Sequence, residues 1–406
     1  MRTIVLVRGL LVFFCVGTAT SALPPNVMVV SGGSGDPLQL YSFDSQSGAT
    51  SYLSSSAVGQ SGWIAAPFGG TSSSSMLPRV AYTIGGGGVN GTGLVKTLNI
   101  NKNGVAVPYG TSASSGGSGP THISVHPWAA AALVANYGSG HIAVLPILYD
   151  WSLGAPTTVL YAGANAHMIQ PDASGKYWFV PCLGVDYIAQ YVWTGAGQLV
   201  PNNPPTVSVT SRAGPRHLAF HPGGNYAFVV NELDSTIATF AYNPATGSLV
   251  PSPRYGSTLP PGRSNVGQSA AAVLVAPDGR FVYATNRGVP YCGVAVFVFD
   301  SASGALSPAA FYAENDAYIF WPRFAALTAD GRFALVVGER SNAVAVFSRD
   351  AASGALARVA GFNLTGLRGP SWAAVFATSV TSSCVASALP STALAIAVLL
   401  AASVLR

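Results

Sequence analysis

Charged side chains are scarce in this sequence of 406 residues, of which Asp, Glu, Lys and Arg together make up only 8%. The formal net charge of +5 includes Arg2, Arg8 and Arg406, which lie in terminal segments that we expect to be removed. Without these three, 16 basic residues face 14 acidic ones, and no stripe of basic residues is present. Nucleic-acid-binding proteins use such a stripe to neutralise phosphates, so we expect no nucleic-acid partner.

Cysteine is also rare, with four residues in the whole chain. Cys15 lies in the expected leader, which leaves Cys182, Cys292 and Cys384 scattered along the mature sequence. This number and spacing predict neither a disulfide framework nor a zinc site. Cys182 and Cys292 either form one disulfide or stay buried thiols. Clusters of acidic residues are missing too, so we expect no metal and no other cofactor.

Several common catalytic motifs are absent. The sequence contains no G-x-S-x-G, no H-E-x-x-H and no P-loop. Residues 86–91 match G-x-G-x-x-G, but no helix is expected to follow them, so we interpret them as a loop. Amphipathic helical periodicity is missing between the two ends, whereas Gly and Pro are frequent, at 46 and 28 residues. This composition favours many short strands joined by turns.

Both ends of the chain have the features of targeting signals. In residues 1–22, Arg2 and Arg8 flank an apolar run, and Thr20-Ser21-Ala22 offers a cleavage site, which predicts a signal peptide. An uncleaved anchor is the alternative. Residues 379–406 place a small polar spacer before an apolar tail, as in a glycosylphosphatidylinositol (GPI) attachment signal. A retained tail-anchor helix is the alternative there.

These signals predict a protein that is secreted or held on the extracellular side of the plasma membrane. Its only membrane attachment would be the C-terminal lipid anchor. Two N-x-S/T triplets, at Asn90 and Asn363, are expected glycosylation sites on this route. Residues 23–378 would then form the mature domain, which we expect to be a monomer.

A repeat runs through this mature part. Each unit has an apolar strand, a Pro/Gly/Asp turn, an alternating strand, a third strand and a Ser/Thr-Gly-x-Leu-like closing turn. The first strands of the units (A strands) begin near Trp63, His122, His167, His217, Ala270, Phe324 and Trp372. The second strands (B strands) begin near Val27, Ala81, Ala132, Tyr177, Ala227, Phe281 and Phe333. The closing turns carry Gly48, Gly104, Gly154, Gly197, Gly247, Gly304 and Gly354.

The repeat predicts an all-β, seven-bladed β-propeller with four-stranded blades. The first B strand, near Val27, has no A strand before it, and the last A strand, near Trp372, has no B strand after it. We expect these two strands to share one blade and close the ring without leaving a free sheet edge.

Polar residues gather at one end of these strands. A and B strands are antiparallel neighbours, so the start of A and the end of B lie on the same rim. A-strand starts contribute His122, His167, Arg216, His217 and Arg323, while B-strand ends contribute Asn136, Asn231, Glu232, Asn286, Arg287 and Glu339. We interpret the three asparagines as turn residues. His126 and His221 lie at the other strand ends, next to prolines, and are expected to be structural.

The motifs at this rim resemble those of a known family, the seven-bladed lactonases. They include Gly119-Pro120-Thr121-His122, Gly214-Pro215-Arg216-His217, Asn231-Glu232-Leu233-Asp234, Thr285-Asn286-Arg287-Gly288 and Trp321-Pro322-Arg323-Phe324, and the likeness covers about residues 26–376. The family includes bacterial-type 6-phosphogluconolactonase and fungal carboxy-cis,cis-muconate cyclase. Two stretches depart from the family pattern and change the charge of the rim. Cys182 and Tyr187 replace an Asp and an Arg, and Gly338-Glu339 replaces Asn-Gln.

The resemblance implies a catalytic set of His167, Glu232, Arg216 and Arg287. From their position at the same rim, we expect His122, His217 and Arg323 to contact the substrate. The arginines would hold an anion, since guanidinium binds carboxylate and phosphate in a bidentate manner, and a neutral histidine can move a proton. We therefore expect hydrolysis of a small anionic sugar-type lactone. Two alternatives remain: a muconate-type cycloisomerase, and a non-catalytic surface propeller that binds a carbohydrate, an organic acid or a protein. Inter-blade ion pairing would account for the same residues in that last case.

Overall fold

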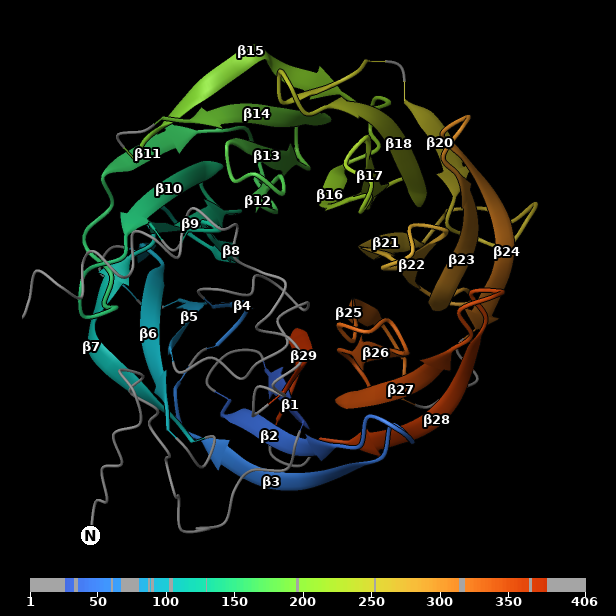
Figure 1. Ribbon diagram of the computed structural model, residues 1–406, viewed down its shortest axis with the longest axis horizontal. Helices are drawn as coiled ribbons and strands as arrows, with labels where there is room; N and C mark the ends of the chain where they lie inside the picture. Colours follow the sequence, from blue (N-terminus) through green and yellow to red (C-terminus); the bar gives the residue numbers. More distant parts are fainter. Residues whose placement is uncertain are drawn as a thin grey trace, which may run out of the picture.

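The protein is a ring of β-sheets around a central axis, as the computed structural model shows in Figure 1. The structure describes residues 26–377, with gaps at 33–35, 60, 67–79, 87, 89–90, 102–104, 129, 195–196, 252, 314–317 and 365–366. Seven sheets follow one another around the ring, and the described residues contain no α-helix. The expected seven-bladed β-propeller is confirmed.

Each blade has four strands that follow one another in order from the axis to the circumference, and blade 5 has a fifth strand. Blade 1 contains β29 (Trp372–Ala377), β1 (Asn26–Ser31), β2 (Leu38–Phe43) and β3 (Thr50–Ser56). Blade 2 contains β4 (Ile64–Ala65), β5 (Val80–Gly85), β6 (Leu94–Ile100) and β7 (Ala106–Ser114). Blade 3 contains β8 (Pro120–Val125), β9 (Ala131–Asn136), β10 (His141–Pro146) and β11 (Thr158–Tyr161). Blade 4 contains β12 (Gln170–Pro171), β13 (Tyr177–Cys182), β14 (Tyr187–Trp193) and β15 (Leu199–Ser208).

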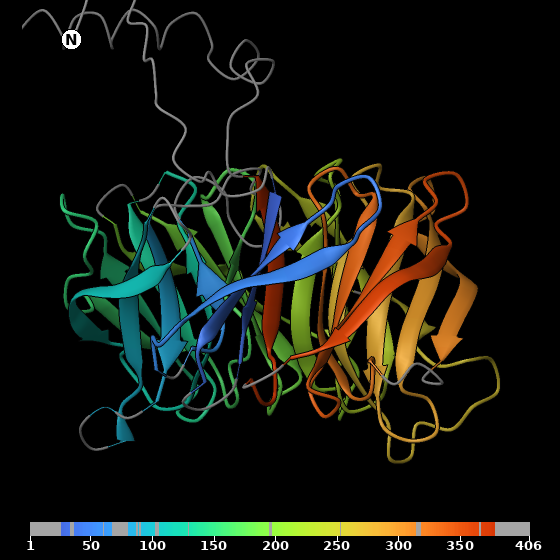
Figure 2. The ribbon, with the colours of Figure 1, turned by 90° about the horizontal axis from the view of Figure 1, so that it is seen from below.

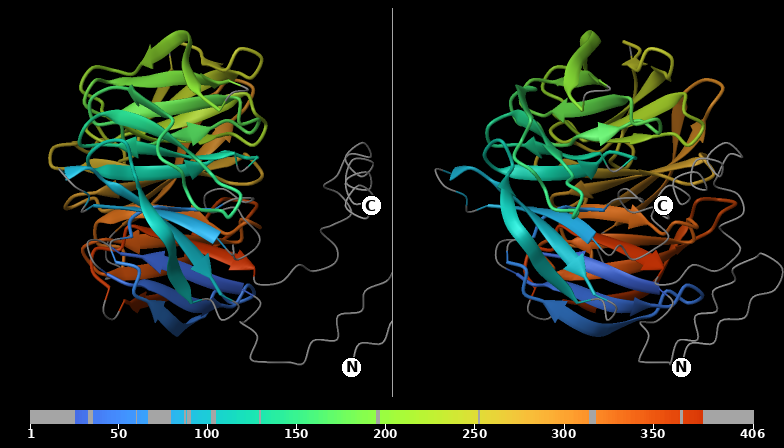
Figure 3. Two further views of the ribbon diagram at one scale, coloured as in Figure 1. Left: turned by 90° about the vertical axis from the view of Figure 1, so that its left-hand side faces the viewer. Right: turned by 60° about the vertical axis from the view of Figure 1, so that its left-hand side comes forward.

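Blade 5 contains β16 (Pro215–Phe220), β17 (Tyr226–Asn231), β18 (Thr236–Asn243) and β19 (Ser248–Leu249), and β20 (Arg254–Ser257) also pairs with β18. Blade 6 contains β21 (Ser269–Val275), β22 (Phe281–Arg287), β23 (Gly293–Asp300) and β24 (Ala305–Ala313). Blade 7 contains β25 (Pro322–Leu327), β26 (Phe333–Gly338), β27 (Ala343–Arg349) and β28 (Leu356–Asn363). Seen from the side, the strands run between the two faces of the ring (Figures 2 and 3).

The ring closes as the sequence predicts. Strand β1 pairs antiparallel with β29, with Val27 opposite Phe376 and Ser31 opposite Trp372. The two ends of the described chain therefore share blade 1, and the pairing covers the edge that each strand would otherwise expose. The second and first strands of every blade also pair antiparallel, so the predicted rim exists. In blade 5, for example, Pro215 at the start of β16 lies opposite Asn231 at the end of β17.

Neighbouring blades are joined by an aromatic side chain that packs on a glycine turn. Tyr177 at the start of β13 lies against Gly247 in the closing turn of the next blade, and Phe281 lies against Gly354 in the same way. Both glycines have a positive φ, at 66° and 73°, which favours glycine, and a Cβ at either one would collide with the ring. The closing turns of blades 5 and 7 are therefore also contacts between blades. Gly104 lies outside the described residues.

The predictions for the two ends of the chain concern residues that the structure does not describe. These are the signal peptide, the lipid-anchor signal and the glycosylation site Asn90. Asn363 is described and is exposed at the end of the outer strand β28. Within the described ranges, no helix has the length and apolar character needed to cross a membrane.

Candidate functional site

A repeated β-bulge shapes the rim of the central channel. In β8, β16 and β25 the pairing register shifts after the first proline, so one extra residue stands between two paired ones. The extra residues are Thr121, Arg216 and Arg323. A bulge changes the direction in which side chains point. All three of these residues line one cavity in the mouth of the channel.

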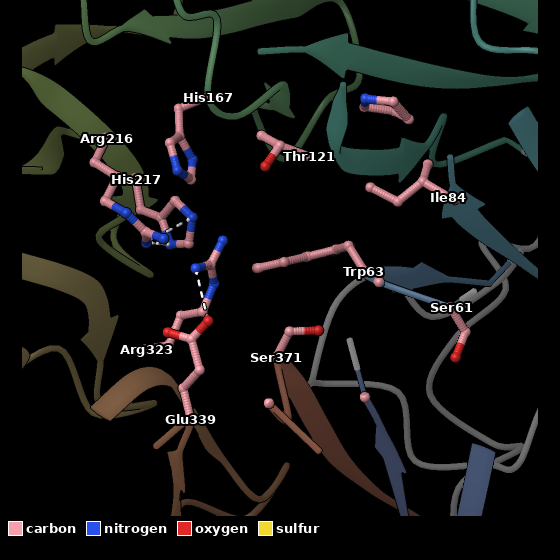
Figure 4. A pocket seen from close by; sticks show the side chains of 15 residues that line it. Ser61, Trp63, Ile84, Thr121, His167, Arg216, His217, Arg323, Glu339 and Ser371 are labelled. Carbon is pink, nitrogen blue, oxygen red and sulfur yellow. Dashed lines mark hydrogen bonds and ion pairs between the residues drawn. The ribbon is translucent and has the colours of Figure 1, made fainter. Parts of the chain in front are cut away.

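This mouth cavity has a volume of about 270 Å³, which is the size of a small-molecule site. Figure 4 shows that the charged and imidazole side chains lie on one side of this cavity, whereas Ser61 and Ile84 lie on the other. The lining residues are Gly32, Ser61, Gly62, Trp63, Ile84, Gly85, Pro120, Thr121, His167, Arg216, His217, Arg323, Glu339, Gly369 and Ser371.

Arg216 is held in place by a group of three charges. Its Nε donates to Oε2 of Glu232 at 2.8 Å, and Nη2 of Arg287 lies 2.9 Å from the same oxygen. The Arg216 side chain is only 2% exposed, and that of Glu232 is 23% exposed. Burial and the charge of Arg287 lower the pKa of Arg216, while Glu232 raises it. The ordinary pKa of guanidinium is so high that Arg216 remains a cation at neutral pH.

The backbone also takes part in fixing these arginines. Nη1 of Arg216 donates to the carbonyl of Ala271, and Nη2 of Arg287 donates to that of Ala270. Both carbonyls belong to β21, the innermost strand of blade 6. Arg216 therefore bonds from blade 5 to blade 6, whereas Arg287 bonds within blade 6 and reaches blade 5 through Glu232. A buried cation whose donors are used in this way keeps one orientation toward the cavity.

Two neutral histidines stand beside Arg216. His167 and His217 are each 6% exposed, and their ring centroids lie 5.1 Å apart. Burial lowers the pKa of both side chains well below the usual value, and the nearby charge of Arg216 lowers it further. Nε2 of His217 lies 3.2 Å from Nη1 of Arg216. Nδ1 of His167 is buried without a hydrogen-bond partner among the described residues, and the side chain lines the cavity.

The irregular first strand of blade 4 explains the position of His167. Strand β12 has only two residues, and the preceding segment pairs through an isolated bridge between Ala166 and Cys182. His167 donates its backbone N–H to the carbonyl of Pro181 at 2.9 Å. Asn165, two residues earlier, has φ of 56° in the left-handed region that asparagine tolerates. The break keeps the His167 backbone tied to β13 while its ring faces the cavity.

The structure places His122 outside the lining of the mouth cavity. It was expected to contact the substrate, but its side chain is fully buried and does not line the mouth cavity. Its ring centroid lies 4.2 Å from that of Trp63, and its Nδ1 accepts the backbone N–H of Ile169 at 3.4 Å. In β8 the extra residue Thr121 faces the cavity, while the His122 ring packs against Trp63.

Glu232 and Arg287, which were expected in the catalytic set, do not line the mouth cavity. Glu232 bonds directly to Arg216, and Arg287 bonds to Glu232. They stand at the ends of the second strands of blades 5 and 6, one strand farther from the axis than Arg216. The expected residues that do line the cavity are His167, Arg216, His217 and Arg323.

The residues that the sequence indicated as structural occupy structural positions. His221 bonds to Gly223 and Gly279 through its two ring nitrogens, and His126 stacks on Trp178. Asn136 and Asn286 hold neighbouring loops: the Nδ2 of Asn136 donates to the carbonyls of Ser115 and His141, and that of Asn286 to the carbonyl of Tyr291.

The two described cysteines do not form a disulfide. Both side chains are fully buried, and Cys182 and Cys292 are not joined to each other. Burial raises the pKa of Cys182 to about 12, so the thiol is protonated at neutral pH and is a poor nucleophile. Of the two possibilities that the sequence left open, the structure has the buried thiols.

Trp63 is an important residue that the sequence analysis did not assign to the site. It is 8% exposed, and its ring packs against His122, His217 and Phe324. A second cavity, of about 610 Å³, lies toward the turn of His221 and shares Trp63 and His217 with the mouth cavity. Trp63 thus helps to separate the two cavities. In the sequence, Trp63 was indicated only as the start of an A strand, and the strand itself begins at Ile64.

No metal site is evident in the described ranges, which contain no group of three or more His, Cys, Asp or Glu side chains able to hold an ion. The chemistry that the site offers is that of a small cavity with fixed cations and neutral imidazoles. Guanidinium groups are suited to binding oxyanions, and a neutral imidazole is suited to accepting a proton.

Comparison with known proteins gives consistent results. Residues 13–366 match the model of the family described as "Lactonase, 7-bladed beta-propeller". A 6-phosphogluconolactonase of Sodalis glossinidius is 31% identical over 261 residues, which are 64% of this chain and 75% of the relative. A 6-phosphogluconolactonase of Bacillus subtilis is 31% identical over 282 residues, 66% of this chain and 76% of the relative.

Solved structures have the same architecture. The periplasmic gluconolactonase of Pseudomonas aeruginosa superposes with a TM-score of 0.74 at 24% identity, covering 87% of this chain and 99% of the other. At this identity the likeness establishes the fold and leaves the chemistry to the residues of the site.

Proposed function

This chain belongs to the family of seven-bladed β-propeller lactonases, and on that premise we propose that it hydrolyses a small anionic lactone of the sugar type. The observation that carries the proposal is the mouth cavity, in which buried Arg216 and neutral His167 face the same space. The relatives named 6-phosphogluconolactonase support the class of reaction. Three arginines against two glutamates at this rim favour an anionic substrate.

In the proposed reaction a water molecule adds to the lactone carbonyl carbon. The His167 imidazole, which lines the cavity, accepts one proton of this water, and the carbonyl oxygen becomes an oxyanion that the Arg216 guanidinium stabilises. The bond between the carbonyl carbon and the ring oxygen then breaks. The ring oxygen takes the proton from His167, which gives a hydroxy acid and returns the imidazole to its neutral form.

The low pKa of His167 suits the second half of this sequence. Burial and the neighbouring arginines disfavour the imidazolium, so the protonated ring is a strong acid and readily gives its proton to the leaving alkoxide. Glu232 has a different role. Because both arginines bond to its Oε2, it serves as a positioning residue for Arg216 rather than as a base. Arg287 is a positioning residue in the same sense.

The location of the protein is part of the proposal. We propose that residues 1–22 direct the chain into the secretory route and that residues 379–406 are exchanged for a lipid anchor. Exposed Asn363 is available for glycosylation there. The mature protein would then act as a monomer outside the cell, on lactones that reach the cell surface.

The test is turnover of a panel of lactones by the full chain, followed as acid release at constant pH. The panel contains glucono-1,5-lactone, its 6-phosphate and a carboxymuconolactone. We expect hydrolysis of at least one sugar lactone, and a loss of about 100-fold or more in kcat for His167→Gln. His221→Gln, in the turn beyond the second cavity, is the matched control and should keep the wild-type rate. No turnover of any lactone would overturn the proposal in favour of a binding protein, and cyclisation of a muconate without hydrolysis would favour the cycloisomerase.

A further inference from the structure

We infer that Arg323 and Glu339 form an exchangeable ion pair that sets the preference of the site for anionic lactones. The anionic substituent of the lactone would take the place of Glu339 on Arg323. This inference rests on the proposed function and adds to it the residues that recognise the part of the substrate remote from the reacting carbonyl.

The pair repeats the Arg216–Glu232 pair two blades away. In both blades the arginine is the extra residue of the bulge after the first proline, and the glutamate follows the last residue of the second strand. In both, the two partners are 16 residues apart in the sequence. The arginine and the glutamate therefore occupy equivalent backbone positions in blades 5 and 7.

The two pairs differ in how firmly the arginine is held. Arg216 is 2% exposed, and it donates hydrogen bonds to Glu232 and to the carbonyl of Ala271. Arg323 is 35% exposed and makes one bond, from Nη1 to Oε1 of Glu339 at 3.0 Å. Within the described ranges, its Nε and Nη2 have no hydrogen-bond partner. Arg323 therefore has donors to offer to a ligand, whereas most of those of Arg216 are already used.

The position of Arg323 fits such a role. Both members of the pair line the mouth cavity, and in Figure 4 the Arg323 guanidinium lies toward the middle of the ring formed by the lining residues. Its charge also contributes to lowering the pKa of His167 and of His217, which places it within electrostatic range of the reacting group. An anion bound to Arg323 would therefore be held close to His167.

Exchange of the partner is physically reasonable. A partly exposed ion pair with a single hydrogen bond is weak, whereas a phosphate or carboxylate can bind the free edge of a guanidinium through two bonds. Glu339 is itself partly exposed, so its carboxylate can turn into water when it is displaced. As long as it stays nearby, its charge opposes the incoming anion. Glu339 therefore lowers the affinity for anionic lactones, and Arg323 raises it.

The experiment compares a phosphorylated and a neutral substrate of one skeleton, glucono-1,5-lactone 6-phosphate and glucono-1,5-lactone. For Glu339→Gln we expect the ratio of the KM of the phosphorylated lactone to the KM of the neutral lactone to fall about tenfold. For Arg323→Gln we expect the same ratio to rise about tenfold. The double variant should resemble Arg323→Gln.

A purely structural ion pair would behave differently. Loss of such a pair would change the melting temperature of both variants and would change the KM of the two lactones to the same extent. That result would overturn the inference. The test is independent of turnover, because 6-phosphogluconate and gluconate can be titrated calorimetrically into the same variants. Tighter binding of 6-phosphogluconate to Glu339→Gln without any turnover would support the ion-pair inference while the proposed hydrolase failed. Equal binding with normal turnover would reject the inference alone.

Discussion

Arg216 and Glu232 form an ion pair with an N–O distance of 2.8 Å, in which the arginine side chain is 2% exposed and the glutamate 23%. The same oxygen of Glu232 lies 2.9 Å from Arg287, so one carboxylate serves two largely buried guanidinium groups. Removing that carboxylate would leave two like charges together without a counter-charge. This arrangement controls both the orientation of Arg216 and the stability of the joint between blades 5 and 6.

The first prediction concerns this carboxylate. Glu232→Gln should destabilise the fold by about 3 kcal/mol or more, because breaking a buried ion pair leaves uncompensated charge. Glu339→Gln is the matched control, since it occupies the same register in blade 7 beside the more exposed Arg323, and it should cost less than about 1 kcal/mol. Urea unfolding of both variants measures the difference. If both variants lost the same free energy of unfolding, the burial of Arg216 would not explain the cost of removing Glu232.

The second prediction concerns stability as a function of pH. His122, His167 and His217 are buried, and their pKa values in the fold are lowered by burial, that of His122 to about 3. The unfolded chain therefore takes up protons first. The three histidines make their full contribution to the free energy of unfolding above about pH 6.5. This contribution is lost as the pH falls toward their pKa values in the folded protein, at up to about 1.4 kcal/mol per pH unit for each residue.

Urea unfolding at pH 7.5, 6.5, 5.5 and 5.0 tests this second prediction. His122→Phe keeps the aromatic packing on Trp63 and should reduce the slope below pH 6.5 by the share of one histidine. A variant slope equal to that of the wild type would mean that His122 titrates normally in the folded protein.

The third prediction concerns Trp63. Trp63→Ala should join the mouth cavity to the second cavity, because both are lined by this side chain. Loss of a buried tryptophan of this kind costs about 3–5 kcal/mol, while Trp63→Phe keeps most of the packing and should cost less. Thermal unfolding gives the stabilities. A loss of less than about 1 kcal/mol for Trp63→Ala would show that the neighbouring rings collapse into the space.

The fourth prediction concerns Cys182. Its thiol is buried, and its pKa is raised to about 12, so it should not react with iodoacetamide in the native protein and should react after unfolding. Cys182→Ala should keep kcat/KM within about threefold of wild type. Mass-spectrometric mapping of the alkylated peptides and the lactone assay provide the two measurements. Rapid native alkylation together with lost activity would indicate a thiol nucleophile.

Much of the fold could be predicted because the repeat is local. Each unit carries its own strand alternation and closing glycine, and the unpaired first and last strands reveal how the ring closes. The rim followed from antiparallel pairing alone, so His167, Arg216 and Arg323 could be expected on the same side. That His122 does not line the mouth cavity could not be predicted from the sequence. Period-two alternation cannot show where an extra residue enters a strand, and a bulge changes the facing of the residues beside it.

By itself the sequence determined the number of blades, their strand order and the rim at which the charged residues meet, since these depend on repeats and on pairing between neighbours in the chain. Only the tertiary structure decided which of those residues face the cavity and which hold their neighbours. Arg216 and Arg323 share one sequence pattern, yet one is buried among acceptors from blade 6 and the other is open to the cavity. Burial and charge compensation come from adjacent blades, and no stretch of a single repeat contains that information.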